Sequence, residues 1–200
     1  MKPVAAKLSL VAILALFVFP LIFAWVTYSG LIDWQPEDTE NLGQLVIPPV
    51  PLDWNRTELV GQPESNGLHG HWVVLLPLQI PCQADCLIRV TQVRQVHRAL
   101  GRHQDRVRIA LLGEQTIPAE EMNTLHEIYR QFNLLEGPDV LFTEALQQVA
   151  EQQGALRGAT LFYLVDPLGN IMMTYDGQDG PSKLSKDLKK LMAWSKLDTR

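Results

Sequence analysis

The sequence predicts an α/β domain that follows one long apolar segment near the N-terminus. Two aliphatic runs, at residues 72–76 and 107–112, have the length and composition of buried strands, and a segment with helical spacing joins them. A third run, at 160–165, is followed by a strong turn and a partner strand at 171–175. A βαβ unit followed by a ββα unit is the order of a thioredoxin-like fold, with a right-handed parallel crossover.

Apolar spacing and helix-ending residues place the helices between and after these strands. The first helix carries Val90, Val93, Val96 and Leu100 and ends at Gly101. The second opens at Pro118, with an inner face of Met122, Leu125, Tyr129 and Phe132. A third runs over 138–153. The last begins near Pro181, with leucines inward at 184, 188 and 191 and lysines facing solvent.

Composition excludes several classes of protein. The 200 residues carry a net charge of −5, and 46% of them are hydrophobic. These values do not favour disorder. There is no basic stripe, so we expect no nucleic-acid partner. Two cysteines exclude a multi-disulfide scaffold and a four-thiolate zinc site. They allow one disulfide, a redox pair, or part of a mixed-ligand metal site.

The apolar segment has the length of a membrane span. Residues 8–28 would form a helix about 31 Å long, close to the thickness of a bilayer core, and we expect a transmembrane anchor over residues 8–30. The alternative is a cleaved signal peptide, but the segment is long for one and no clear cleavage site follows. Lys2 and Lys7 precede the segment, and the next basic residue is Arg56. The positive-inside rule then places residues 1–7 in the cytoplasm and the remainder in the periplasm, for a single-pass protein of a bacterial inner membrane.

Residues 31–67 form an acidic, proline-rich spacer before a domain at residues 68–197. The run at 47–51 (IPPVP) is expected to be extended and semi-rigid, which suits a stalk. The alternative is that residues 52–60 pack on the domain as a short hairpin, with Trp54 as a packing residue.

Cys82 and Cys86 lie where the first strand ends and the first helix begins. The unpaired N–H groups and partial positive charge of a helix N-terminus stabilise a thiolate, the reactive form of cysteine. Four-residue spacing places both sulfurs on one helix face, where they can form a disulfide or bind a soft ion such as copper(I). Cys82, nearer the helix start, is the expected nucleophile and Cys86 the resolving thiol. A purely structural disulfide is the alternative, although its small loop would stabilise the fold only slightly.

Three segments resemble the Sco/SenC family of membrane-anchored, thioredoxin-fold proteins that help to build the copper site of cytochrome c oxidase. They are residues 68–76 (LHGHWVVLL), the Cys82-x3-Cys86 pair and residues 162–170 (FYLVDPLGN). The resemblance implies copper(I) ligation by both thiolates, or reduction of a disulfide on an oxidase subunit. The chain is a divergent member: Gln83 and Leu87 stand where the family has proline, and no histidine stands near Gly158, the position of the family's third copper ligand.

Three functions follow from these observations. The first is thiol–disulfide exchange through Cys82 and Cys86 in oxidase assembly, with an oxidase subunit or a periplasmic thiol-redox protein as partner; if the chain is an enzyme, it is a thiol–disulfide oxidoreductase. The second is copper(I) binding by Cys82 and Cys86 without the histidine. The third is a non-enzymatic docking or scaffold role. His69 and His71 precede the first strand, about 25 Å from the cysteines across eight extended residues, so we do not expect them to share an ion with the pair.

Overall fold

The computed structural model of the protein describes residues 3–28, 40–60, 67–154, 161–176 and 179–195. The chain divides into two units, Met1–Glu40 and Asn41–Arg200, each of which is compact in itself.

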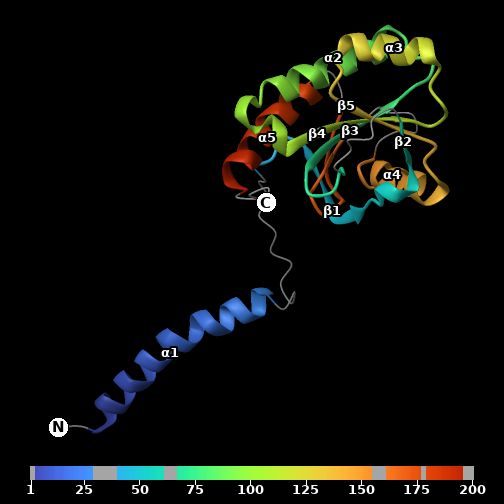
Figure 1. Ribbon diagram of the computed structural model, residues 1–200. Coiled ribbons are helices and arrows are strands. Elements are labelled where there is room, and N and C mark those ends of the chain that lie inside the picture. Colours follow the sequence, from blue (N-terminus) through green and yellow to red (C-terminus); the bar gives the residue numbers. More distant parts are fainter. Residues whose placement is uncertain (1–2, 29–39, 61–66, 155–160, 177–178, 196–200) are drawn as a thin grey trace. The chain divides into compact units, whose positions relative to one another are not determined.

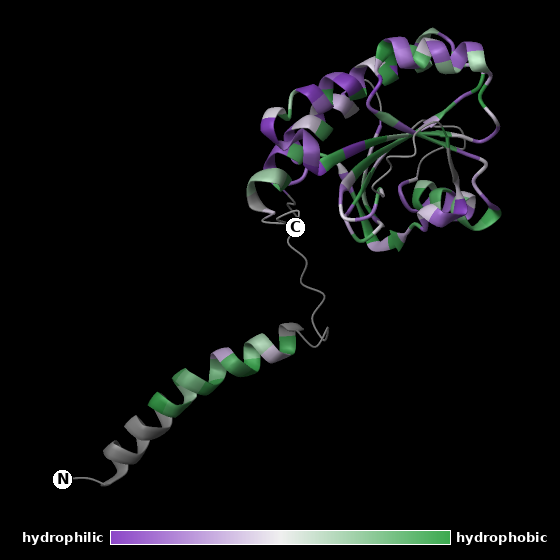
Figure 2. Cartoon of the chain, viewed as in Figure 1, coloured by the Kyte–Doolittle hydropathy of each residue, from purple (hydrophilic) through white to green (hydrophobic). Residues whose placement is uncertain are grey.

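Among its described residues, the first unit contains one helix, α1 (Pro3–Tyr28), with Pro20 inside it. Its side chains are described from Ile13 to Val26. The large apolar residues of this stretch are exposed at successive positions, so they occupy all sides of the helix. Figure 2 shows the hydrophobic colour along most of this stretch. Within the part of the chain that the structure describes, no helix combines the length and the apolar character needed to cross a membrane.

The described part of the second unit is built on a seven-stranded sheet with the order β1-β7-β6-β3-β4-β5-β2 (Figure 1). The strands are β1 (Gln44–Pro51), β2 (Glu58–Val60), β3 (Trp72–Leu78), β4 (Val107–Gly113), β5 (Phe132–Glu136), β6 (Phe162–Val165) and β7 (Asn170–Tyr175). β3, β4 and β5 pair in parallel, and the other pairs are antiparallel. The central position of β3 explains its nearly continuous aliphatic sequence, because both of its faces are covered.

Helices cover the two faces of this sheet and create two cores. The helices are α2 (Ala84–Arg98), α3 (Ala119–Ile128), α4 (Val140–Gln152) and α5 (Gly180–Trp194), with short 3-10 turns η1 (Trp54–Arg56) and η2 (Gly101–Arg106). Val74 and Leu76 of β3 belong to the core that includes side chains of α2, α3 and α5. Val73 and Leu75 belong to the core that includes side chains of α4. The alternation follows from the two-residue period of a strand.

From β3 to α5 the strands and helices follow the predicted order, with one additional strand, β5, between α3 and α4. The second predicted helix was expected to continue to Phe132, but α3 ends at Ile128 and Phe132 begins β5, which pairs in parallel with β4. The helical spacing misleads here because Leu125, Tyr129 and Phe132 all point into the same core, although they come from a helix, a connection and a strand.

The sheet also begins earlier than the domain predicted at residues 68–197. β1 pairs with β7, and β2 pairs with β5, so much of the predicted spacer forms the two edges of the sheet. Prolines are tolerated at a sheet edge because the missing N–H can face solvent. Residues 52–60 do not form a hairpin with each other, but Trp54 is a packing residue, buried and in ring contact with Phe142. The remaining spacer residues at 31–39 and 61–66 lie outside the described residues.

A buried carboxylate fastens the start of β1 to the domain. Asp187 of α5 is 3% exposed. It accepts hydrogen bonds from the backbone N–H groups of Leu42 and Gly43, at 3.0 Å and 2.9 Å, and from the hydroxyl of Tyr175 at 3.0 Å. The chain is therefore held to α5 and β7 at the point where it enters the sheet.

Candidate functional site: the cysteine pair at the start of α2

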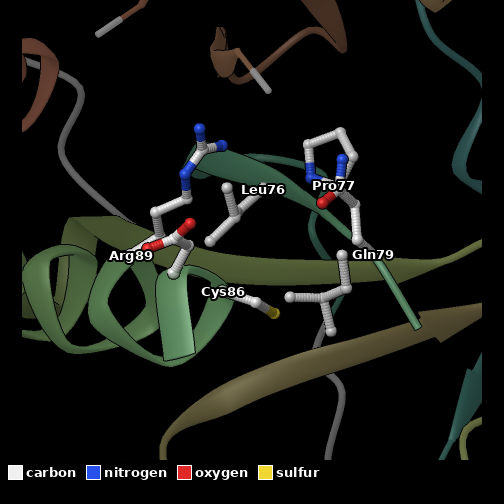
Figure 3. A pocket seen from close by; sticks show the side chains of 7 residues that line it. Leu76, Pro77, Gln79, Cys86 and Arg89 are labelled. Carbon is white, nitrogen blue, oxygen red and sulfur yellow. The ribbon is translucent and has the colours of Figure 1, made fainter. Parts of the chain in front are cut away.

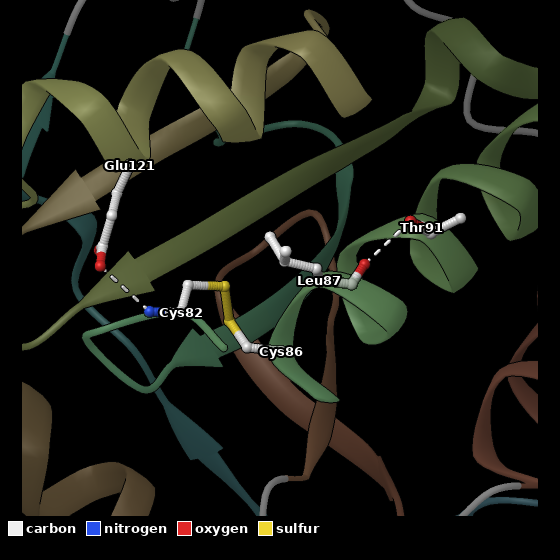
Figure 4. Close-up of a disulfide and its surroundings, with 5 residues drawn as sticks. All are labelled: Cys82, Cys86, Leu87, Thr91 and Glu121. Carbon is white, nitrogen blue, oxygen red and sulfur yellow. Dashed lines mark hydrogen bonds between the residues drawn. A yellow bond between two sulfur atoms is a disulfide. The ribbon is translucent and has the colours of Figure 1, made fainter. Parts of the chain in front are cut away.

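The site forms where β3 ends at Leu78 and the chain turns into α2. Gln83 occupies the N-cap position without a side-chain capping hydrogen bond, so Cys82 lies just before the helix and Cys86 is the third residue of α2. The two cysteines are joined in a disulfide, with their Cα atoms 5.2 Å apart (Figure 4). Both are half-buried and pack against the core that includes α2 and α5. The structure thus brings the two predicted site residues together at the edge where β3 ends.

The helix end supplies a positive electrostatic environment for sulfur. The backbone N–H of Leu87 donates to the carbonyl of Gln83, which starts the helical hydrogen bonding. The N–H groups that precede Leu87 in α2 have no acceptor within the helix, as at any helix start. Their partial charges favour a sulfur anion at this end of α2.

Glu121 of α3 contacts the backbone of Cys82, and the sequence alone did not identify it as a site residue. Its Oε1 accepts a hydrogen bond from the backbone N–H of Cys82 at 3.3 Å (Figure 4). Its Oε2 is buried and has no hydrogen-bond partner. The acidic first turn after Pro118 was visible in the sequence, but its contact with Cys82 depends on how α3 packs near the start of α2.

Two hollows open beside Cys86. The first has a volume of about 210 Å³ and is lined by the end of β3 together with Asp85, Cys86 and Arg89 (Figure 3). The second, of about 290 Å³, is lined by the connecting loop together with Gln83, Asp85 and Cys86. Cys82 lines neither of these two hollows. The two hollows share Gln79, Asp85 and Cys86 in their walls, so they adjoin each other beside the disulfide.

The charged groups around Cys86 partly compensate each other. Burial lowers the pKa of Arg89, and the carboxylate of Asp85 opposes that shift. A guanidinium stays charged at neutral pH. Asp85 and Arg89 therefore present one negative and one positive group at the rim of the same hollow.

The described residues do not assemble the three-ligand copper site that the Sco/SenC resemblance implies. Among them there is no group of three or more His, Cys, Asp and Glu side chains that could hold a metal ion. His69 and His71 lie before β3, at the opposite end of that strand from the cysteines. The position near Gly158 lies outside the described residues. On reduction, the pair would offer two thiolates to a soft ion.

A cysteine pair at the start of the helix that follows a central strand of the sheet, one cysteine just before the helix and one in its first turn, is typical of a thioredoxin-like protein. In agreement, a family model described as "Transmembrane-like, thioredoxin-like, C-terminal domain" matches residues 72–195. The match covers more than half of the chain, and the chain belongs to that family. No curated protein matches the sequence.

Solved structures with a similar fold include redox and Sco proteins. A thiol:disulfide interchange protein of the thioredoxin family from Chlorobium tepidum is 13% identical, with a TM-score of 0.53, covering 72% of this chain and 97% of that one. Copper-bound ScoI from Arabidopsis thaliana is 14% identical, with a TM-score of 0.49, covering 64% and 87%. Copper-bound ScoI from Bradyrhizobium japonicum is 20% identical, with a TM-score of 0.45, covering 71% and 96%. At 13% identity, the likeness to the thiol:disulfide interchange protein shows the fold alone.

Proposed function

We propose that the protein exchanges disulfides with a partner through Cys82 and Cys86. The observation that carries the proposal is the position of the disulfide: it lies at a helix N-terminus, half-buried, beside two open hollows. A disulfide that spans four residues constrains the unfolded chain very little, so stabilisation is a weak reason for the pair.

The chemistry needs only the two sulfurs and a partner disulfide. In the reduced pair, one thiolate attacks a sulfur of the partner's disulfide and releases one partner thiolate, which takes up a proton. The second cysteine then attacks the mixed disulfide and releases the other partner sulfur as a thiol. Two electrons and two protons pass to the partner, and the Cys82–Cys86 disulfide forms again. A dithiol reductant must restore the reduced pair.

We further propose that the exchange takes place in the periplasm and serves the assembly of cytochrome c oxidase, with an oxidase subunit or another thiol-redox protein as partner. The Sco/SenC resemblance of residues 68–76 and 162–170 supports the assembly role. The uncharged stretch at residues 8–30 and the apolar side chains on all sides of α1 support membrane anchoring, with residues 1–7 in the cytoplasm. Alkaline extraction of membranes, followed by protease treatment of spheroplasts, tests this placement. Release into the alkaline supernatant, or protection of the domain in spheroplasts, would contradict it.

The deciding experiment replaces both cysteines by serine in the full chain and measures oxidase activity in cells that lack the native protein. Thiol–disulfide exchange predicts that the Cys82→Ser/Cys86→Ser chain fails to restore the oxidase at wild-type protein levels. Full restoration would show that the chain acts as a docking or scaffold subunit instead.

Copper(I) binding by the reduced pair is the second proposal. The close approach of the two cysteines at the start of α2, with their Cα atoms 5.2 Å apart, supports it, because thiolates are soft ligands. Anaerobic titration of the reduced full chain with copper(I) tests it. One equivalent should bind and be lost in Cys82→Ser, whereas equal binding by both chains would remove the pair from consideration as ligands.

A further inference from the structure

A third hollow lies apart from the cysteine pair, on the face of the sheet that α4 covers. It has a volume of about 420 Å³, and its walls come from the end of β1, η1, the segment before β3, the β6–β7 turn and the first turns of α4. His69 lines it and precedes β3, so the hollow lies at the end of β3 opposite to the disulfide. We infer that this hollow, here called the α4 hollow, binds a segment of a partner protein that presents one large apolar side chain next to a lysine or arginine.

The apolar character of the α4 hollow supports the first part of the inference. Leu52, Phe142 and Ala145 are in its walls, and the first two of these are buried. Two further wall residues are mainly exposed, Leu141 at 54% and Leu168 at 84%. Exposed apolar surface gathered around a concave site is typical of surfaces that bind a partner. An apolar side chain that enters the hollow removes both leucines from water.

The α4 hollow is held in shape by hydrogen bonds that do not use the side chain of Leu168. The carboxylate of Asp166 accepts the backbone N–H of Leu168 at 2.9 Å, which fixes the β6–β7 turn. The N–H of Leu52 donates to the carbonyl of Gly169 at 2.7 Å, which ties the same turn to the wall that follows β1. A site that is already ordered loses little conformational entropy when a ligand binds.

The charges around the α4 hollow support the second part of the inference. Asp53 and Arg56 line the hollow, and the guanidinium of Arg56 lies 3.6 Å from Asp53 and 2.7 Å from Asp139. Two carboxylates therefore share one positive charge. The helix α4 adds two glutamates and contains no lysine or arginine. Negative charge is in excess on this face, so a basic residue beside the bound apolar side chain is attracted to it.

The same charges argue against two other occupants. A second copy of the chain would bring two faces with excess negative charge together, and like charges across an interface oppose binding. An anionic membrane surface would be repelled in the same way. A basic, apolar protein segment is the occupant that both features of the α4 hollow favour.

Short peptide probes test the inference on the full chain in bilayer discs of phosphatidylcholine, a lipid without net charge. The probe is the acetylated dipeptide amide of phenylalanine and arginine, and methyl NMR signals of Leu141, Ala145 and Leu168 should shift with it until they saturate. Glutamate in place of arginine should weaken binding about threefold, the effect of one exposed ion pair. Glycine in place of phenylalanine should weaken it at least about tenfold. No shift with the first probe, or equal affinity for all three, would overturn the inference.

Three variants locate the binding. Leu168→Asn removes an exposed side chain and keeps the backbone N–H that Asp166 accepts, so it should bind the phenylalanine–arginine probe about fivefold more weakly. Ile88→Asn is the matched control, because Ile88 is 54% exposed but lies on α2, which covers the other face of the sheet. Asp53→Asn keeps an oxygen that can cap η1, and it should abolish the preference for arginine over glutamate. Equal binding by Leu168→Asn and Ile88→Asn, or an unchanged preference in Asp53→Asn, would refute the argument.

The same signals distinguish the other occupants before any probe is added. If a second copy fills the α4 hollow, the methyl signals of Leu168 will change with protein concentration. If the bilayer covers it, a spin-labelled lipid in the disc will broaden them. Either result would overturn the inference, which predicts signals that are independent of protein concentration and unaffected by the labelled lipid.

Discussion

The hydrogen-bonded carboxylate of Asp187 gives the sharpest prediction about stability. Asp187→Ala removes the acceptor for three donors: the N–H groups of Leu42 and Gly43 and the hydroxyl of Tyr175. Leaving a buried donor unsatisfied costs about 1–3 kcal/mol. The two backbone groups can turn to water only if the start of β1 detaches from α5, which in turn loses packing. We expect a loss of about 3 kcal/mol, a large share of the roughly 5–15 kcal/mol typical of a folded domain.

Urea unfolding of the full chain measures this loss, and hydrogen exchange at Leu42 and Gly43 locates it. Both amides should exchange faster in Asp187→Ala than in the unsubstituted chain. Asp187→Asn should cost less, because the amide keeps one acceptor oxygen. Asp176→Asn is the matched control, since Asp176 is exposed at the end of β7. Equal stability of Asp187→Ala and Asp176→Asn, with unchanged exchange at the two amides, would refute the reasoning.

Three further predictions concern pH and backbone conformation. Hydrogen bonds from the N–H of Phe142 and the guanidinium of Arg56 lower the pKa of Asp139 from 3.8, so its contribution to stability is complete above about pH 4 and is lost as pH falls through the lowered pKa. Asp139→Asn still caps α4, and it should make the melting temperature depend less on pH in this acid range. A pH dependence equal to that of the unsubstituted chain would contradict the assignment. Burial raises the pKa of Tyr163 from 10.0 to about 12, so the stability that its neutral hydroxyl gives the fold is complete below about pH 10 and is lost as pH rises toward the raised value. Tyr163→Phe should therefore unfold less at alkaline pH than the unsubstituted chain does. Equal alkaline unfolding of the two chains would argue against this role of Tyr163. Gly169 has a φ of +92°, and an added Cβ would lie 3.0 Å from the carbonyl oxygen of Leu52. Gly169→Ala should therefore unfold at a lower temperature than the control Gly137→Ala, because Gly137 has a positive φ but no such contact. Equal melting temperatures of the two variants would count against the contact with Leu52.

The parallel core of the sheet could be predicted because its strands are locally unambiguous. β3 and β4 are short aliphatic runs bounded by polar residues or turn formers, and both lie within the sheet, where such composition is required. The β6–β7 hairpin could be predicted from its turn: the carboxylate of Asp166 accepts the N–H groups of Leu168 and Asn170. These signals are local, so they predict the strands and the turn without any knowledge of the fold.

The edges of the sheet could not be predicted, because their strands depend on partners distant in sequence. β1 contains three prolines and resembles an extended linker, yet Val46 and Val50 are buried once β1 pairs with β7. β5 continues the apolar spacing of α3, and only its pairing with β4 shows it to be a strand. For the same reason the sequence identifies Cys82 and Cys86 but not Glu121, whose contact with Cys82 spans 39 residues.

The most direct test of the account captures the partner of the cysteine pair. Full chains carrying Cys82→Ser or Cys86→Ser, each of which keeps one cysteine of the pair, are expressed in host cells. Thiols are blocked with acid and alkylating agent, and disulfide-linked complexes are identified by mass spectrometry. The account predicts a partner protein that is joined through the remaining cysteine in one of the two chains and released by reductant. A chain that remains free of disulfide-linked protein in both Cys82→Ser and Cys86→Ser cells would contradict thiol–disulfide exchange as its function.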